Sequence, residues 1–232
     1  MGALRRYYSA SRTPLYGLVA GLPLLLLYEG LSALSRASIR NGADVWLVRL
    51  LPLPPSVSVW ALKLLALGAV GLLLMWRDRT TKIRAHFLGL MVIEATVYSF
   101  LLGGLVVFVL RAVALLAFPA LGDALSQLTL SLGAGLYEEL LFRVLLFGGL
   151  SALLSALSGR PGWSVVLGAL VSALLFAVAH NVGALGEPFE LTRFAYRTLS
   201  GLVFTGLYVT RGFGITALTH ALYDVWIVLG VT

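Results

Sequence analysis

Long apolar runs, separated by short polar or basic segments, cover almost the whole chain. A helix of about 20 residues crosses the hydrocarbon core of a bilayer, and the runs reach this length repeatedly. They show no strand-type alternation of apolar and polar positions. The pattern therefore predicts an all-α fold, a polytopic membrane helical bundle with about seven transmembrane helices. The expected spans are residues 14–34, 57–76, 86–110, 132–157, 163–180, 191–210 and 215–231.

Two connectors are long enough to hold structure of their own. Within residues 36–56, the stretch that begins at Asp44 is amphipathic but too short to span, so it is expected to lie at the membrane interface. Residues 111–131 are interrupted by a proline and a glycine, and they are expected to form a loop or a surface helix. In the first span, Gly17 and Gly21 form a pair of small residues that would let a neighbouring helix approach closely.

The composition agrees with a membrane protein. Of the 232 residues, 59% are hydrophobic and 12% are charged, whereas a soluble domain carries about 25% charged residues. The net charge is +7, but most basic residues flank the apolar runs, where they set topology and contact anionic lipid. This placement argues against a nucleic-acid partner. An N-terminus on the cytoplasmic side would put the basic loop 77–84 there as well, as the positive-inside rule requires.

Polar residues that could do chemistry are concentrated late in the chain. We therefore divide it into residues 1–128, three N-terminal spans and their loops without a catalytic motif, and residues 129–232, a catalytic transmembrane core. In the first part, Glu29 and Lys63 each lie about six residues from the same end of their spans, which predicts a buried ion pair. Glu94, inside the third span, has no partner that the sequence identifies.

Two adjacent carboxylates and an arginine open the fourth span. An ionised side chain deep in a bilayer costs about 2.5–3.5 kcal/mol on insertion scales. Two consecutive charged residues at such a depth therefore indicate that at least one of them has a function. On an α-helix, Glu139 and Arg143 are neighbours four residues apart, whereas Glu138 points about 140° away from Arg143. We expect Arg143 to hold Glu139 as structural support and Glu138 to be the working carboxylate.

Two further polar clusters can reach the same depth. His180 ends the fifth span with Phe176 one turn before it, and His220 and Asp224 share one face of the last span. Adjacent spans are antiparallel, so the start of the fourth span meets the end of the fifth. Glu138 lies about 9 Å into its span and Asp224 about 12 Å from the chain end on the same side. The clusters are therefore expected to line one water-accessible cavity.

A carboxylate and two histidines around one point suit two kinds of hydrolysis. Glu138 could act as general base on a water held by His180, with His220 and Asp224 at the carbonyl oxygen. Alternatively, the same residues could bind zinc, which would supply the hydroxide. The chain has no cysteine, the histidines lie on separate helices, and no His-Glu-x-x-His pattern is present. We therefore expect no cofactor and no metal, with zinc as the alternative.

The ordered motifs resemble one known family. Glu138-Glu139-x-x-x-Arg143, then Phe176-x-x-x-His180, then His220-x-x-x-Asp224, is similar to the CPBP family, which comprises type II CAAX prenyl proteases and the bacteriocin-processing and self-immunity (Abi) proteins. The resemblance covers about residues 130–230. It implies an intramembrane endopeptidase that cleaves a membrane-embedded or membrane-associated peptide. It also implies that Glu138 and His180 activate water, and that His220 and Asp224 form the oxyanion site.

One position departs from the family pattern. Position 224 is often asparagine in CAAX proteases, and an ionised aspartate cannot donate the hydrogen bond that an asparagine amide donates. Asp224 is either protonated in its apolar surroundings or, as we expect, orients a cationic His220 that donates instead. The compact, cysteine-free chain looks bacterial, which implies a multi-pass protein of the bacterial cytoplasmic membrane and makes CAAX cleavage itself the minor expectation. A proton-coupled transporter would show inverted repeats, which we do not find. A non-catalytic immunity protein with the same fold stays open.

Overall fold

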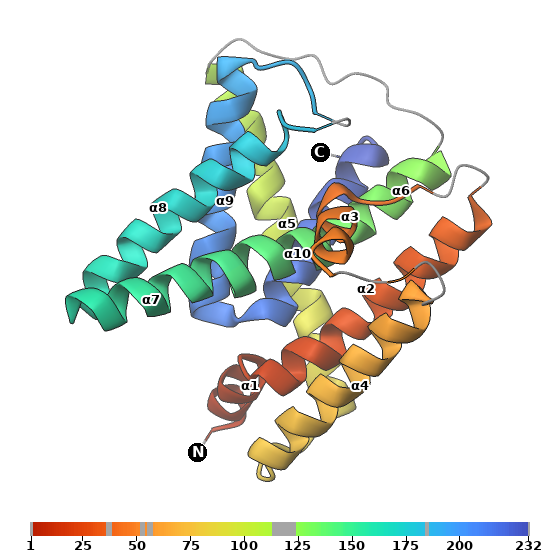
Figure 1. Ribbon diagram of the computed structural model, residues 1–232, viewed down its shortest axis with the longest axis vertical. Helices are drawn as coiled ribbons and strands as arrows, with labels where there is room; N and C mark the ends of the chain where they lie inside the picture. Colours follow the sequence, from red (N-terminus) through yellow and green to blue (C-terminus); the bar gives the residue numbers. More distant parts are fainter. Residues whose placement is uncertain are drawn as a thin grey trace.

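The computed structural model describes residues 2–35, 39–51, 54, 58–112, 124–183 and 186–231, without the side chains of residues 106–112. The described residues are mostly helical and contain no strand (Figure 1). The α-helices are α1 (Ala3–Ser11), α2 (Pro14–Leu34), α3 (Gly42–Arg49), α4 (Val59–Arg77), α5 (Ala85–Ala112), α6 (Ala124–Gly133), α7 (Gly148–Ser158), α8 (Pro161–Ala179), α9 (Leu191–Arg211) and α10 (Phe213–Val228). Two π-helical segments, η1 (Ala134–Glu138) and η2 (Leu140–Phe147), join α6 to α7.

Each of the seven predicted spans falls on a helix, but only five described segments are long and apolar enough to cross a membrane. These five are α2, α4, residues 85–105 of α5, the continuous run 124–158, and α8. The helix α9 is more polar, with Arg193 and Arg197 near its start, and α10 is apolar but has 16 residues. The chain is an integral membrane protein with an all-α polytopic fold.

The motif-bearing span begins earlier than its sequence predicts. Helix α6 starts at Ala124, so the predicted connector over residues 111–131 is helical from that point on and continuous with the motif-bearing span, not a loop. The polar residues there fit a helix because Thr129 and Ser131 donate to the carbonyl oxygens four residues earlier, at 2.7 and 2.9 Å. The rest of that predicted connector, residues 113–123, lies outside the described residues.

Around the paired carboxylates this span is wider than an α-helix. In η1 and η2 the backbone closes i→i+5 hydrogen bonds, a geometry that is common at functional sites. The α-helical geometry assumed for this stretch is therefore wrong. The wider turn reduces the angular separation of positions five apart, so Glu138 and Arg143 lie closer in rotation than the 140° expected from an α-helix.

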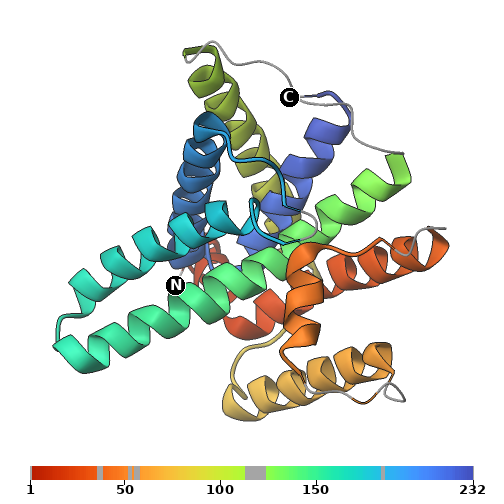
Figure 2. The ribbon, with the colours of Figure 1, turned by 45° about the horizontal axis from the view of Figure 1, so that its top comes forward.

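Helix α10 lies at the centre of the bundle, where it packs against α2, α5, α6, η1 and α9 (Figures 1 and 2). The main hydrophobic core accordingly draws buried side chains from α2, α5, η1 and α10. The close approach predicted at Gly17 is confirmed, because a Cβ there would lie 3.4 Å from the backbone nitrogen of Gly214. The last helix is thus enclosed by elements from both parts of the chain.

The closest of these packings depends on Gly135 in η1. A Cβ at this position would lie 2.5 Å from the carbonyl oxygen of Ala217 and 2.6 Å from the Cβ of Ala221. We therefore expect Gly135→Ala to push η1 away from α10 and to lower the unfolding free energy by about 1–3 kcal/mol. Thermal unfolding in lipid nanodiscs measures this.

The matched control is Gly149→Ala, further along the same continuous span. A Cβ at Gly149 would have no atom within 4 Å, so this variant should be as stable as the wild type or slightly more stable. An unchanged melting temperature for Gly135→Ala would contradict the close packing of η1 on α10.

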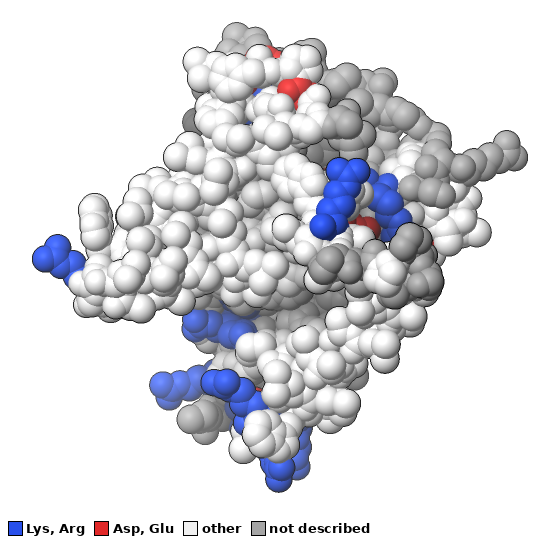
Figure 3. Space-filling model, in the orientation of Figure 1, with Lys and Arg blue, Asp and Glu red and all other residues white. Residues whose placement is uncertain are grey.

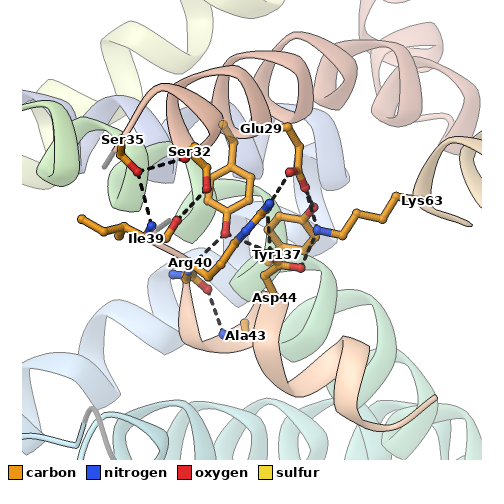
Figure 4. A network of polar contacts seen from close by, with 11 residues as sticks. Glu29, Ser32, Ser35, Ile39, Arg40, Ala43, Asp44, Lys63 and Tyr137 are labelled. Atoms are coloured by element: carbon orange, nitrogen blue, oxygen red, sulfur yellow. Dashed lines mark hydrogen bonds and ion pairs between the residues drawn. The ribbon is translucent and has the colours of Figure 1, made fainter. Parts of the chain in front are cut away.

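A buried network of charges joins the N-terminal helices to η1 (Figure 4). The predicted pair is confirmed: Lys63 Nζ lies 2.6 Å from Glu29 Oε1, and it also lies 2.7 Å from Asp44 Oδ1. Arg40 completes the set through ion pairs with Glu29 and Asp44. Tyr137 donates to Glu29 Oε1 at 3.2 Å. Two cations and two anions therefore balance, and they connect α2, α3 and α4 to the turn that carries the carboxylate motif.

A second ion pair assigns a partner to Glu94. Arg211 donates to both of its carboxylate oxygens, at 2.5 and 2.7 Å, and Tyr7 donates to it at 2.5 Å. Arg211 also donates to Ser11 at 3.0 Å. Glu94 therefore fixes α5 to the end of α9 and to α1.

Exposed basic side chains gather at the end of the molecule that carries α1 and the end of α4 (Figure 3). Hydrogen bonds place the start of α2 beside the basic loop, because Tyr16 Oη donates to the Lys82 carbonyl and accepts from the Arg84 amide, both at 2.9 Å. This clustering is the arrangement that the positive-inside rule favours for one membrane face.

Candidate active site

The three polar motifs meet around the ring of Phe176 in α8. The ring centre lies 4.9 Å from that of His180 and 6.3 Å from that of His220, both in edge-on geometry. The guanidinium of Arg143 lies over the same ring, 4.5 Å from its centre. Phe176 is thus a buried spacer that holds residues of η2, α8 and α10 at fixed separations.

Glu139 is fully buried and bridges two of these motifs. Its Oε2 lies 3.1 Å from Arg143 Nε, which is the pair expected from their spacing. Its Oε1 lies 2.7 Å from His220 Nδ1, a contact that the sequence did not predict. Because a carboxylate only accepts, the proton of this bond belongs to Nδ1. Glu139 therefore orients the imidazole of His220 as well as balancing Arg143.

The nearer carboxylate to His220 is Glu139 rather than the expected Asp224. Asp224 Oδ2 lies 3.6 Å from His220 Nε2, beyond hydrogen-bond length. The imidazole is held from a third side by Phe204, which stacks on it with ring centres 4.4 Å apart. His220 thus has a carboxylate beside each ring nitrogen, one within hydrogen-bond distance and one beyond it.

His180 ends α8, and its side chain is held by a backbone carbonyl one turn earlier in the same helix. Its Nδ1 lies 2.8 Å from the carbonyl oxygen of Phe176, which can only accept, so Nδ1 carries the proton. In the neutral tautomer Nε2 is then a hydrogen-bond acceptor. The carbonyl of His180 accepts from the amide of Glu187 at 2.8 Å, which folds the following loop back onto the helix end.

The same loop is held by arginines of α9. Arg197 lies 2.9 Å and Arg193 3.3 Å from Glu187 Oε2. Burial alone would raise the pKa of Glu187, but its hydrogen bond to Arg197 and the charges of both arginines hold that pKa below its usual value. Glu187 therefore remains ionised at neutral pH, and its ion pairs anchor the loop to α9.

Glu138 has surroundings quite different from those of its neighbour Glu139. It is only partly buried, and its Oε1 accepts a hydrogen bond from the side-chain amide of Asn41 at 2.9 Å. His180 and His220 both lie close enough to act on it electrostatically. Sequence reasoning missed Asn41, because it lies 97 positions away in a connector and no spacing rule relates it to the motif.

Within the described residues, no three side chains of His, Cys, Asp or Glu lie close enough together to hold one metal ion. His180 and His220 each use Nδ1 in a hydrogen bond, which leaves only Nε2 on either ring for a further contact. Both histidine side chains are thus held in place by hydrogen bonds.

One family model matches the chain. Residues 120–226 fit the model described as type II CAAX prenyl endopeptidase Rce1-like. This part of the chain is similar to that family. The match contains all three motifs, and it supports the resemblance to CPBP proteins that the motifs indicated. No curated protein and no solved structure was found to match the chain.

The match supports a membrane protease of the CAAX type, a kind of protease that acts on membrane-associated substrates. The matched stretch runs from just before α6 to near the end of α10. It therefore includes Glu138, His180, His220 and Asp224 but excludes Asn41 and the charge network around Lys63.

Proposed function

We propose that this protein is an intramembrane endopeptidase that hydrolyses a peptide bond in a membrane-embedded or membrane-associated peptide. In this proposal Glu138 and His180 activate the water, and His220 and Asp224 form the oxyanion site. The observation that carries the proposal is the contrast between the two adjacent glutamates. Glu139 is closed off between Arg143 and His220, whereas Glu138 keeps only an amide donor among the described residues and lies near both histidines.

Two acceptors suit the activation of water. A water molecule has two protons, and it can donate one to a carboxylate oxygen of Glu138 and the other to Nε2 of His180. Glu138 takes a proton as the water oxygen attacks the peptide carbonyl, and it later returns that proton to the leaving nitrogen. One C–O bond forms and the C–N bond breaks, so no further reactant is needed.

The opposite side of the carbonyl needs a donor. His220 has its Nδ1 proton on Glu139, and a proton on Nε2 would point a second donor at the developing oxyanion. The carboxylates of Glu139 and Asp224 on either side stabilise the resulting imidazolium. Asp224 thereby acts through His220. The imidazolium donates the hydrogen bond that an asparagine amide would donate at this position.

The test is comparative analysis of membrane peptides in cells that produce the wild-type protein or Glu138→Gln at equal levels. Peptides whose production stops in the variant identify the substrate and the cleaved bond. A quenched peptide that ends in Cys-aliphatic-aliphatic-X, with and without a farnesyl group, then decides whether prenylation is required. Identical peptide sets in both cells would instead favour a transporter or a non-catalytic immunity protein.

The zinc-dependent alternative makes a different prediction. We expect active, purified protein to contain no stoichiometric metal, because the candidate ligands lie on three separate helices and no three histidine or acidic side chains of the described residues lie close enough to share one ion. Elemental analysis together with prolonged chelation and metal add-back measures this. One zinc per chain, with activity lost on its removal and regained on its return, would overturn the glutamate mechanism.

A further inference from the structure

Asn41 lies in the connector before α3, and its side chain contacts the carboxylate motif at Glu138. Building on the proposed function, we propose that Asn41 is a positioning residue for the catalytic Glu138. Its amide nitrogen would hold one carboxylate oxygen, Oε1, and leave the other to face the water. Asn41 lies outside the segment that the Rce1-like family model covers.

The orientation of the Asn41 amide is fixed by a second contact. The backbone N–H of Ala43 can only donate, and it lies 2.9 Å from the side-chain oxygen of Asn41. The nitrogen of the same amide must therefore face Glu138, where it donates to Oε1 at 2.9 Å. One side chain thus caps α3 with its oxygen and binds Glu138 with its nitrogen.

The backbone of Asn41 is held as tightly as its side chain. Its N–H donates to Tyr28 Oη at 2.9 Å, and that hydroxyl donates to Asp44 in α3 at 2.9 Å. Gly133, just before η1, leaves room for this arrangement, because a Cβ there would lie 2.8 Å from the Cβ of Asn41. Asn41 is 6% exposed. The connector is therefore clamped against the turn that carries Glu138.

This geometry has a specific effect on the carboxylate. An amide donor stabilises the ionised form, which is the form that can accept a proton from water, and hydrogen bonds to charged groups are the stronger ones. It also restricts the rotation of the side chain. Loss of such a bond should lower kcat about 10- to 100-fold, with a small effect on KM.

Two substitutions separate this role from simple capping. Serine and aspartate are helix caps as good as asparagine, so a cap-only role predicts normal kcat for both Asn41→Ser and Asn41→Asp. A positioning role predicts the 10- to 100-fold loss for Asn41→Ser. For Asn41→Asp it predicts, in addition, that the acidic limb of the kcat profile moves to higher pH, because the new carboxylate opposes ionisation of Glu138.

The matched control is Ser58→Asp, which places the same carboxylate at the cap of α4, where Ser58 accepts from the Ala61 amide at 3.3 Å. It should leave both kcat and the pH profile unchanged. Cleavage is followed with the peptide whose production stops in Glu138→Gln cells.

A stability cycle tests the contact without any substrate. Asn41→Asp alone should lower the melting temperature, because two carboxylates then face each other. Adding Glu138→Gln should restore it, since the new amide can donate to the aspartate, while activity stays absent. Equal melting temperatures for Asn41→Asp in both backgrounds, or wild-type kcat and pH profile for Asn41→Ser and Asn41→Asp, would overturn the role of Asn41. Full activity of Glu138→Gln would instead overturn the proposed function itself, so the two failures are distinguishable.

Discussion

Replacing Glu138 by glutamine is expected to lower kcat by about 10²–10⁴-fold while leaving the unfolding free energy nearly unchanged. Glutamine has the same size and keeps an oxygen that can accept from Asn41, but it cannot take a proton from water. The charge of Glu138 is not part of the pair that neutralises Arg143 at its Nε. Peptide cleavage and thermal unfolding, both measured in lipid nanodiscs, test the two halves of this expectation.

The control for this variant is Glu190→Gln. Glu190 lies in the loop before α9, where it is 43% exposed and pairs with Arg193 at 2.8 Å. Exposed ion pairs contribute little to stability, so neither activity nor melting temperature should change. Full activity of Glu138→Gln would show that this carboxylate is not the general base.

The largest stability effect is expected at Glu139 and Arg143. Their side chains are 0% and 1% exposed, and removal of one partner leaves the other charge buried without compensation. Glu139→Gln or Arg143→Ala should therefore lower the unfolding free energy by about 3–5 kcal/mol. Glu139→Gln should also lower activity, because His220 loses the carboxylate on Nδ1. Unfolding in nanodiscs at fixed lipid composition measures the first effect.

A double variant separates the two roles of Glu139. Removal of both charges in Glu139→Gln/Arg143→Met should recover much of the stability, since replacing a complete buried pair is often nearly neutral. Activity should remain low, because the imidazole of His220 still lacks its carboxylate. Wild-type stability of Glu139→Gln alone would contradict the buried pair, and recovery of activity in the double variant would contradict the role of Glu139 at His220.

Local periodicity was sufficient for much of the fold and for contacts within one helix. Apolar runs located the helices, and spacing by four residues identified the pair of Glu139 and Arg143. Depth counted along two spans was enough to match Glu29 with Lys63. These predictions succeeded because each rests on a rise or rotation per residue that a helix keeps constant.

The contacts that the sequence did not predict depend on how separate elements pack. The bond from Glu139 to His220 requires Gly135 to bring η1 against α10, and nothing near either residue indicates this. Asn41 lies in a connector whose path is set by tertiary contacts. The wide turn of η1 and η2 has no apolar period that distinguishes it from an α-helix. The pairing of Glu94 with Arg211 likewise joins helices that are far apart in sequence.

Because one hydrophobic core joins helices from both ends of the chain, the motif-bearing segment is not an interchangeable module. Tyr137, inside the stretch matched by the family model, packs its ring against Tyr28, outside it, with ring centres 5.2 Å apart. A fragment or chimera that keeps residues 120–226 but takes its first helices from a relative would lose the packing of α10 against α2 and α5. Transfer of the proposed site to another scaffold would therefore have to include α2, α5 and the connector that carries Asn41 along with the motifs.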